Sequence, residues 1–289
     1  MVQPPIAPTR ERLKLRGNYT GVGADYTVEQ HWDQYDADEH DIWRTLFLRQ
    51  IGLAECYAAP EVLAGLRLLG ATADAIPDFV QVNATLGRAT GWRIVAVPGL
   101  IPEAQFFAHL ANRAFPVSVW MRERSELDYL AEPDLFHDFF GHVPLLMNPV
   151  FARFMQAYGA AGPKAIAMNA IPMLARLYWY TVEFGLIRAS GGLKAYGAGI
   201  LSSKGETVYS VESDVPHRVG FDLERVMRTH YLIDDYQRIY FVLDDFEQLF
   251  TSGYGTDFAP LYDRYRETDG IPPGVLLETD RIVTRGSQQ

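Results

Sequence analysis

The sequence of 289 residues contains a single cysteine, Cys56. One cysteine excludes an intrachain disulfide framework and a thiolate-rich structural zinc site, and it is compatible with a reducing compartment. Basic residues are also scarce, since 26 Lys and Arg stand against 36 Asp and Glu and leave a net charge of −10. An acidic chain repels phosphate backbones and anionic lipid surfaces, so we expect neither a nucleic-acid nor a membrane partner.

Long apolar runs are missing as well. The most apolar region, residues 165–187, is interrupted by Asn169, Pro172, Arg176 and Glu183, so no segment is expected to span a bilayer. The N-terminal residues are proline-rich and then basic, without the apolar core of a secretory signal. No repeat or long linker divides the chain. The sequence therefore predicts one domain in a cytoplasmic protein.

Two histidines stand out in the apolar and aromatic segment 133–144. His137 and His142 are five positions apart, and on an ideal α-helix this spacing turns the second side chain by about 140° from the first. Asp134 is placed to cap a short helix bracketed by two prolines. We expect Gly141 to distort that helix and to swing His142 back toward His137.

A carboxylate in an aromatic run is the third candidate. Glu183 lies within residues 174–187, whose apolar spacing predicts a buried helix that ends at the glycines 191–192. A bare buried carboxylate costs several kcal/mol, so Glu183 should be protonated, paired or bound to a cation. Arg176 and Arg188 are possible partners, and a metal ion is the alternative.

Two imidazoles and one carboxylate are the ligand set of non-haem Fe(II) oxygenases, and they also bind catalytic zinc. The short histidine motifs of zinc hydrolases, His-Glu-x-x-His and its inverted form, are absent. A third interpretation is a helical scaffold in which His137, His142 and Glu183 form a buried hydrogen-bond network. The residues alone leave these three interpretations open.

At these positions the sequence resembles the pterin-dependent aromatic amino acid hydroxylases, from about Tyr26 to about Tyr254. The matching blocks follow one another in the family's order: 132–134 with Asp138, 141–145, 178–179 with 181–186, 194–199, and 201–203 with 205–206. The resemblance implies a mainly α fold, a single catalytic domain with a few short strands. We expect this domain at 21–270, between an extended N-terminal segment, 1–20, and a C-terminal tail, 271–289.

The resemblance also implies an activity, the hydroxylation of L-phenylalanine to L-tyrosine with O2 and a tetrahydropterin as co-substrates. The Fe(II) ligands would be His137, His142 and Glu183, and Tyr178 and Asp138 would orient ligands or water beside the metal. Hydroxylation of tryptophan is the alternative within the family, and zinc-dependent hydrolysis is the alternative outside it.

The resemblance places the pterin site after a predicted strand in residues 92–102. Backbone groups at Gly99 and Leu100 would hold the pterin ring, and Phe106 would stack on it. Without the resemblance, Phe106 would be interpreted as a core residue of a helix that begins near Glu103.

The amino acid substrate would lie between polar and aromatic groups. By resemblance Arg122, at the end of a predicted strand over residues 115–121, grips the substrate carboxylate and is braced by Asp134, with Arg124 as the competitor for this role. Trp179 and Phe184 would line the ring pocket, and Ser202 would lie near the substrate's polar end. The sequence departs from animal members at Leu130, where they carry a threonine that helps to bind the amino acid.

Further helices are expected at residues 31–50, 58–69 and 222–250, with a capped helix after Asp78 that ends near Gly87. Ile233 occupies a position where tyrosine-specific relatives carry an acid, and an apolar side chain there fits an unhydroxylated ring. Residues 271–289 show no heptads, so the coiled coil of tetrameric relatives is not expected. The sequence therefore predicts a monomer.

Overall fold

The computed structural model describes residues 15–130, 132–253 and 255–287. Most of the predicted N-terminal segment lies outside these residues. Helices dominate, and the prediction of a mainly α catalytic domain with short strands is confirmed. The longer helices are α1 (Ala37–Tyr57), α2 (Pro60–Leu68), α3 (Phe79–Thr90), α4 (Glu103–Ala111), α5 (Pro149–Ala167), α6 (Ile171–Tyr178), α8 (Lys204–Glu212) and α10 (Phe246–Gly253). Shorter ones are α7 (Ala198–Ser202), α9 (Leu223–Arg228) and α11 (Ala259–Tyr265).

The strands form two sheets within the described residues. The first pairs β1 (Arg93–Val97) with β2 (Ala114–Ser118) in parallel, and α4 makes the crossover between them. The second has the order β4-β3-β6-β5-β7 and mixes parallel and antiparallel pairs. Its members are β3 (Leu186–Ala189), β4 (Gly192–Ala195), β5 (His217–Gly220), β6 (Ile239–Leu243) and β7 (Ile282–Thr284).

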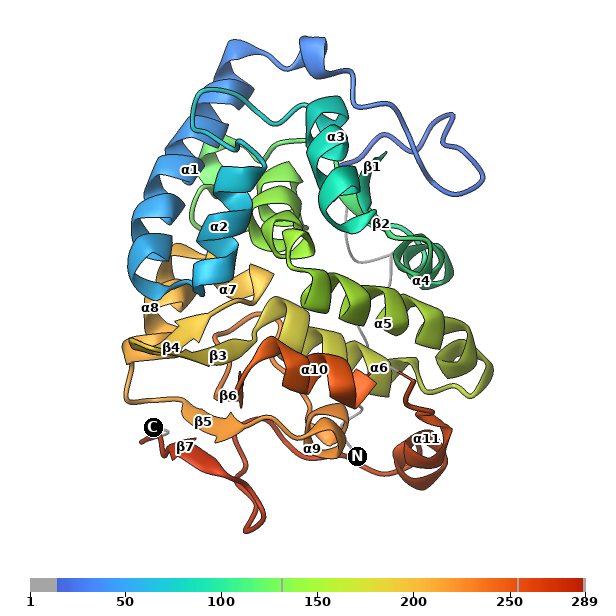
Figure 1. Ribbon diagram of the computed structural model, residues 1–289, viewed down its shortest axis with the longest axis vertical. Coiled ribbons are helices and arrows are strands. Elements are labelled where there is room, and N and C mark those ends of the chain that lie inside the picture. The colour runs from blue at the N-terminus through green and yellow to red at the C-terminus, as the bar shows by residue number, and fades with distance from the viewer. Residues whose placement is uncertain (1–14, 131, 254, 288–289) are drawn as a thin grey trace.

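Figure 1 shows how these elements are arranged. Helix α5 crosses the middle of the molecule, with α1 to α4 on one side and the five-stranded sheet with α6, α9 and α10 on the other. The segment predicted as a C-terminal tail supplies β7 to this sheet, and Asp280 next to it makes a buried ion pair with Arg225 at 2.8 Å. Over the described residues, this segment is packed against the domain.

Capping explains where the first helices start. The Asp36 side chain accepts hydrogen bonds from the backbone N–H groups of Asp38 and Glu39, so α1 begins at Ala37 and not within the earlier acidic stretch. It also continues to Tyr57, beyond the predicted end at residue 50. Asp78 caps α3 as predicted, and that helix runs to Thr90, three residues past Gly87.

The prediction of a distorted helix that brings His142 back toward His137 is confirmed, and the distortion is a π-helix over residues His137–His142. Hydrogen bonds in a π-helix join residues i and i+5, so a five-residue spacing brings two side chains to neighbouring places on the same face. Gly141 serves a different purpose. A Cβ there would lie 2.7 Å from the Cβ of Ala198, so the absence of a side chain lets α7 approach the π-helix closely.

The predicted helix over residues 174–187 is wrong at its C-terminal end. Helix α6 passes into a second π-helix, Trp179–Glu183, in which the Phe184 N–H donates to the Trp179 carbonyl over 2.8 Å. The chain then turns at once into β3, which pairs with both β4 and β6. Buried apolar residues are common to helices and central strands, so the pattern alone could not separate the two.

Two other predicted segments differ. Residues 222–250, predicted as helical, contain the fully buried strand β6 between α9 and α10. Here too, a run of buried apolar residues fits a helix as well as a central strand. Strand β2 ends at Ser118, so Arg122 follows the strand by four residues and does not lie at its end. Arg122 is nevertheless buried, and its backbone N–H donates to Asp134 over 3.0 Å.

Candidate metal centre

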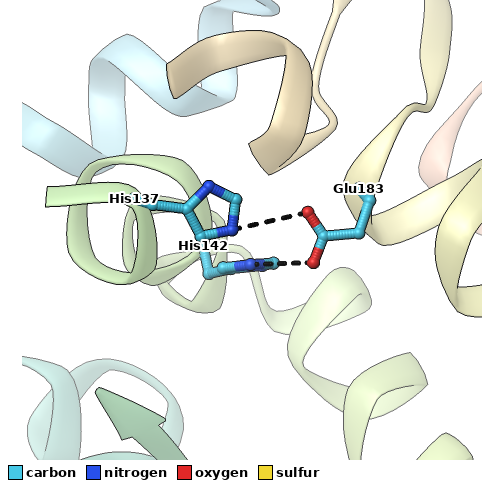
Figure 2. Close-up of side chains that lie close together, drawn as sticks. All are labelled: His137, His142 and Glu183. Carbon is cyan, nitrogen blue, oxygen red and sulfur yellow. Dashed lines mark ion pairs between the residues drawn. The ribbon is translucent and has the colours of Figure 1, made fainter. Parts of the chain in front are cut away.

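The two π-helices bring His137, His142 and Glu183 together. Their nearest ligand atoms all lie within 4.8 Å of one another, although about 40 residues separate the histidines from the glutamate in sequence. Figure 2 shows both imidazoles and the carboxylate pointing toward a common centre from opposite sides. Glu183 lies 3.6 Å from His137 Nε2 through Oε2, and 3.2 Å from His142 Nε2 through Oε1.

The surroundings of Nδ1, the ring nitrogen that faces away from Glu183, differ between the two histidines. His137 Nδ1 lies 2.8 Å from the Ser202 hydroxyl, which leaves Nε2 facing Glu183. Burial lowers the pKa of His137 to about 4, so the ring is neutral at physiological pH and offers a lone pair. His142 Nδ1 is buried without a hydrogen-bond partner among the described residues. A completed hydrogen-bond network would satisfy this atom, so the scaffold interpretation fits the geometry poorly.

Glu183 supplies the negative charge. Burial alone would raise its pKa, but the facing His142 and His137 rings and the Gly199 backbone N–H outweigh burial and hold the pKa below its ordinary value. The two arginines predicted as alternative partners of Glu183 interact with other groups. Arg176 donates to the Met227 carbonyl and contacts His230, and Arg188 pairs with Asp244. An ionised carboxylate facing two imidazoles is a donor set that a divalent cation fits.

Asp138 and Tyr178 border this set. A carboxylate oxygen of Asp138 accepts the Ser118 backbone N–H at 2.8 Å, and burial raises the Asp138 pKa to about 7. The Tyr178 ring lies 6.1 Å from the His142 ring, between centroids, and burial raises its pKa well above the ordinary value. Tyr178 therefore lies beside a candidate metal ligand, and Asp138 is near enough to His142 to interact with it electrostatically.

The predicted pterin residues approach the same centre from α4 and the loop before it. The Phe106 ring contacts the Tyr178 ring edge-on, with centroids 5.6 Å apart, so one aromatic ring separates it from His142. Gly99 has φ +147°, a conformation that disfavours other residues. Leu100 is partly exposed, and its carbonyl accepts a 2.8 Å hydrogen bond from the Tyr19 hydroxyl.

Among the predicted substrate residues, Asp134 is tied directly to the metal-site segment, because it accepts the His137 backbone N–H over 3.0 Å. Arg122 makes two parallel hydrogen bonds to Asp134, from Nε and Nη2, both at 2.8 Å, and both side chains are buried. Arg124 instead forms exposed ion pairs with Asp38 and Asp41, so it is the weaker candidate for gripping a carboxylate. Trp179 and Phe184 contact each other, with ring centroids 4.8 Å apart.

The structure adds a residue that the sequence did not predict. Tyr231 stacks on Trp179, with centroids 4.2 Å apart and planes inclined by 15°. Only the fold brings these residues together, since 52 positions separate them. The only residue near Tyr231 that the sequence analysis had singled out was Ile233, where tyrosine-specific relatives carry an acid. Ile233 is exposed.

A family model described as biopterin-dependent aromatic amino acid hydroxylase matches residues 11–259. The chain belongs to this family. The predicted resemblance is thereby confirmed, and so is the prediction of a non-haem iron monooxygenase that uses a tetrahydropterin. Membership in this family argues against the alternative that His137, His142 and Glu183 bind a catalytic zinc ion in a hydrolase.

Relatives within this hydroxylase family cover nearly the whole chain. A phenylalanine-4-hydroxylase of Ralstonia nicotianae is 54% identical over 265 residues, which are 92% of this chain and 84% of that protein. One of Caulobacter vibrioides is 48% identical, over 93% of this chain and 91% of its own length. A tyrosine 3-monooxygenase of Rattus norvegicus is 38% identical over 71% of this chain and 42% of that protein.

A solved structure agrees with the fold. The crystal structure of phenylalanine hydroxylase from Chromobacterium violaceum bound to cobalt superposes with a TM-score of 0.89 at 54% identity, covering 91% of this chain and 95% of that one. In the part of this hydroxylase that the structure describes, no helix is both long enough and apolar enough to cross a membrane.

Proposed function

We propose that this chain hydroxylates L-phenylalanine to L-tyrosine with O2 and a tetrahydropterin. The observation that carries the proposal is the convergence of two imidazoles and one carboxylate in a chain about half identical to several phenylalanine-4-hydroxylases. The iron and the pterin would supply the activation of dioxygen, and the protein supplies binding, orientation and exclusion of water.

In this proposal His137 Nε2, His142 Nε2 and a Glu183 oxygen hold the Fe(II). Three protein donors would leave the remaining coordination positions of the metal for other ligands. The Ser202 hydroxyl fixes the ring orientation of His137 through Nδ1. Asp138 and Tyr178 lie beside these ligands and orient water or co-substrate.

Arg122 and Asp134 would bind the amino acid end of the substrate. The hydrogen bonds to Asp134 use Nε and Nη2, and Nη1 makes no hydrogen bond to another described residue, so it remains for the substrate carboxylate. Ser202, whose hydroxyl lies 2.8 Å from His137 Nδ1, would lie near the polar end of the substrate. Trp179 and Phe184 would hold the aromatic ring.

The pterin would lie on the loop before α4. Backbone groups at Gly99 and Leu100 would hydrogen-bond its ring, and the half-buried Phe106 would stack on it. Phe106 contacts Tyr178, so the bound pterin would lie near the metal ligands. Tyr19 supports this loop through the Leu100 carbonyl.

We also propose a cytoplasmic monomer in which residues 21–270 make up the catalytic domain. The absence of heptads in 271–289 supports the monomer. Sedimentation at several protein concentrations tests it, and a tetramer that persists on dilution would contradict it.

The proposed reaction is tested by an aerobic assay with Fe(II), a tetrahydropterin and each aromatic amino acid in turn, with hydroxylated products identified by mass. We expect tyrosine from phenylalanine as the main product. Faster hydroxylation of tryptophan would favour the alternative within the family. Activity restored by Zn(II) and not by Fe(II) would contradict an iron monooxygenase.

A further inference from the structure

Ring packing, and no hydrogen bond to a described residue, orients the Trp179 indole. Its Nε1 is buried and has no hydrogen-bond partner among the described residues. Two rings contact it closely, Phe184 at 4.8 Å and Tyr231 at 4.2 Å between centroids. Phe184 belongs to the same turn of chain as Trp179, whereas Tyr231 comes from a distant segment. Tyr231 is therefore the independent support for the indole.

The segment around Tyr231 is neither helix nor strand between Thr229 and Ile239, yet both neighbours of Tyr231 are fixed. On one side, the His230 carbonyl accepts a 2.6 Å hydrogen bond from Tyr180, and the His230 N–H donates to the Ile271 carbonyl over 2.8 Å. Tyr180 follows Trp179 directly in the chain. The π-helix and the Tyr231 segment are thus joined next to the stacked pair.

On the other side, the Gln237 side chain holds Leu232 at both its backbone N–H and its carbonyl, at 3.2 and 2.7 Å. Gln237 is itself buried, and its backbone N–H donates to a Glu206 oxygen over 3.2 Å. The Tyr240 hydroxyl donates to the same Glu206 oxygen over 2.6 Å. A buried polar chain therefore connects α8 and β6 to the segment that carries Tyr231.

We propose that Tyr231 is a positioning residue that holds the Trp179 indole and thereby sets the preference of the ring pocket for a single-ring side chain. This inference rests on the proposed function, because it takes Trp179 as a wall of the substrate pocket. An indole free to turn would leave a wider and less defined pocket. The enzyme would then discriminate less strongly against a larger two-ring substrate such as tryptophan. It would also bind phenylalanine less tightly.

The test compares Tyr231→Leu, which removes the stacked ring, with Tyr231→Phe, which keeps it. Tyr236→Leu is a matched control, because Tyr236 lies on the same segment but packs against Tyr209. For each variant, kcat and KM are measured with phenylalanine and with tryptophan, together with the KM of the tetrahydropterin and the tyrosine formed per pterin oxidised. Equilibrium binding of phenylalanine is measured separately, without turnover.

For Tyr231→Leu we expect the KM and Kd of phenylalanine to rise about tenfold, with a smaller change in kcat. The preference for phenylalanine over tryptophan should fall about tenfold in kcat/KM, and the pterin KM should stay within twofold. Tyr231→Phe should restore the wild-type preference, and Tyr236→Leu should keep it. An unchanged preference and Kd in Tyr231→Leu would overturn the proposal, as would an equal loss in Tyr231→Phe.

If Tyr231→Leu does not fold, Gln237→Leu carries the test, because it releases Leu232 and so loosens the segment that holds the Tyr231 ring against Trp179, without removing either ring. We expect the same direction of change, and an unchanged preference would again overturn the proposal. A wild-type protein that binds phenylalanine but forms no tyrosine would contradict the proposed function. The binding comparison between the variants would still decide the role of Tyr231.

Discussion

The hydroxyl of Ser202 lies 2.8 Å from Nδ1 of His137, on the side of the ring opposite Glu183. Ser202 ends α7, which approaches the first π-helix where Gly141 leaves room. One helix end therefore fixes the rotation of a candidate metal ligand.

Replacing Ser202 by Ala should weaken metal binding. The variant loses the hydrogen bond that orients His137, and removal of such supporting groups typically costs about 10–100-fold in metal affinity. Titration of metal-free protein with Fe(II) under anaerobic conditions, or with Co(II), measures the effect.

The matched control is Ser203→Ala. Ser203 caps α8 through Glu206 and makes no described contact with His137. It should lose about 1 kcal/mol of stability with unchanged metal affinity. Equal metal affinity in both variants would show that Ser202 does not orient the ligand.

Replacing Asp134 by Asn should destabilise the protein. The substitution leaves Arg122 as a buried guanidinium without its carboxylate, and breaking a buried pair typically costs about 3–5 kcal/mol. We also expect a higher KM for phenylalanine. Denaturant unfolding and steady-state kinetics measure the two effects.

Arg124→Gln provides the comparison for this pair, because its ion pairs with Asp38 and Asp41 are exposed. It should change the free energy of unfolding much less than Asp134→Asn does, because exposed ion pairs contribute little to stability. If the two substitutions cost the same, the buried pair has no special role in stability.

Replacing Tyr19 by Phe should raise the KM of the tetrahydropterin a few-fold and leave the phenylalanine KM unchanged. The variant loses the hydrogen bond to the Leu100 carbonyl in the proposed pterin loop. Tyr129→Phe, at an exposed tyrosine, is the control. A pterin KM that is unchanged in Tyr19→Phe would mean that the bond does not support the loop.

Glu206 should make stability depend on pH. Burial raises its pKa to about 7 from an ordinary value of 4.5, so folding favours the protonated form. This contribution is fully present below about pH 4.5 and is lost as the pH rises through 7. Each pH unit between the two pKa values corresponds to about 1.4 kcal/mol, so the contribution amounts to about 3 kcal/mol.

Glu206→Gln isolates this contribution, because a neutral amide still accepts from Tyr240 and Gln237. The free energy of unfolding of wild type relative to the variant should fall between pH 5 and pH 8. Parallel pH profiles for the two proteins would place the Glu206 pKa near its ordinary value.

The donor set could be predicted from sequence because chemistry singled out its members. Two histidines and an acid among apolar residues were candidates for binding one cation, and the structure brings the three together. The pairing of Arg122 with Asp134 was also predicted, by resemblance. The local geometry could not be predicted, since a π-helix has no distinct sequence signature and the effect of Gly141 depends on Ala198, over 50 positions away.

The strands were the least predictable part of the fold. The buried residues of β6 fit a helix as well as a central strand, and only pairing with β3 and β5 decides between them. Tyr231 was missed for a related reason, because its contact with Trp179 depends on long-range packing.

The central claim is that Glu183 completes an iron site with His137 and His142. The most direct measurement is the Fe(II) affinity of metal-free wild-type protein and of Glu183→Gln, with tyrosine formation assayed on the same samples. We expect the wild type to bind one Fe(II) and to gain activity, and the variant to bind iron at least about tenfold more weakly. Wild-type iron affinity in Glu183→Gln would contradict the assignment.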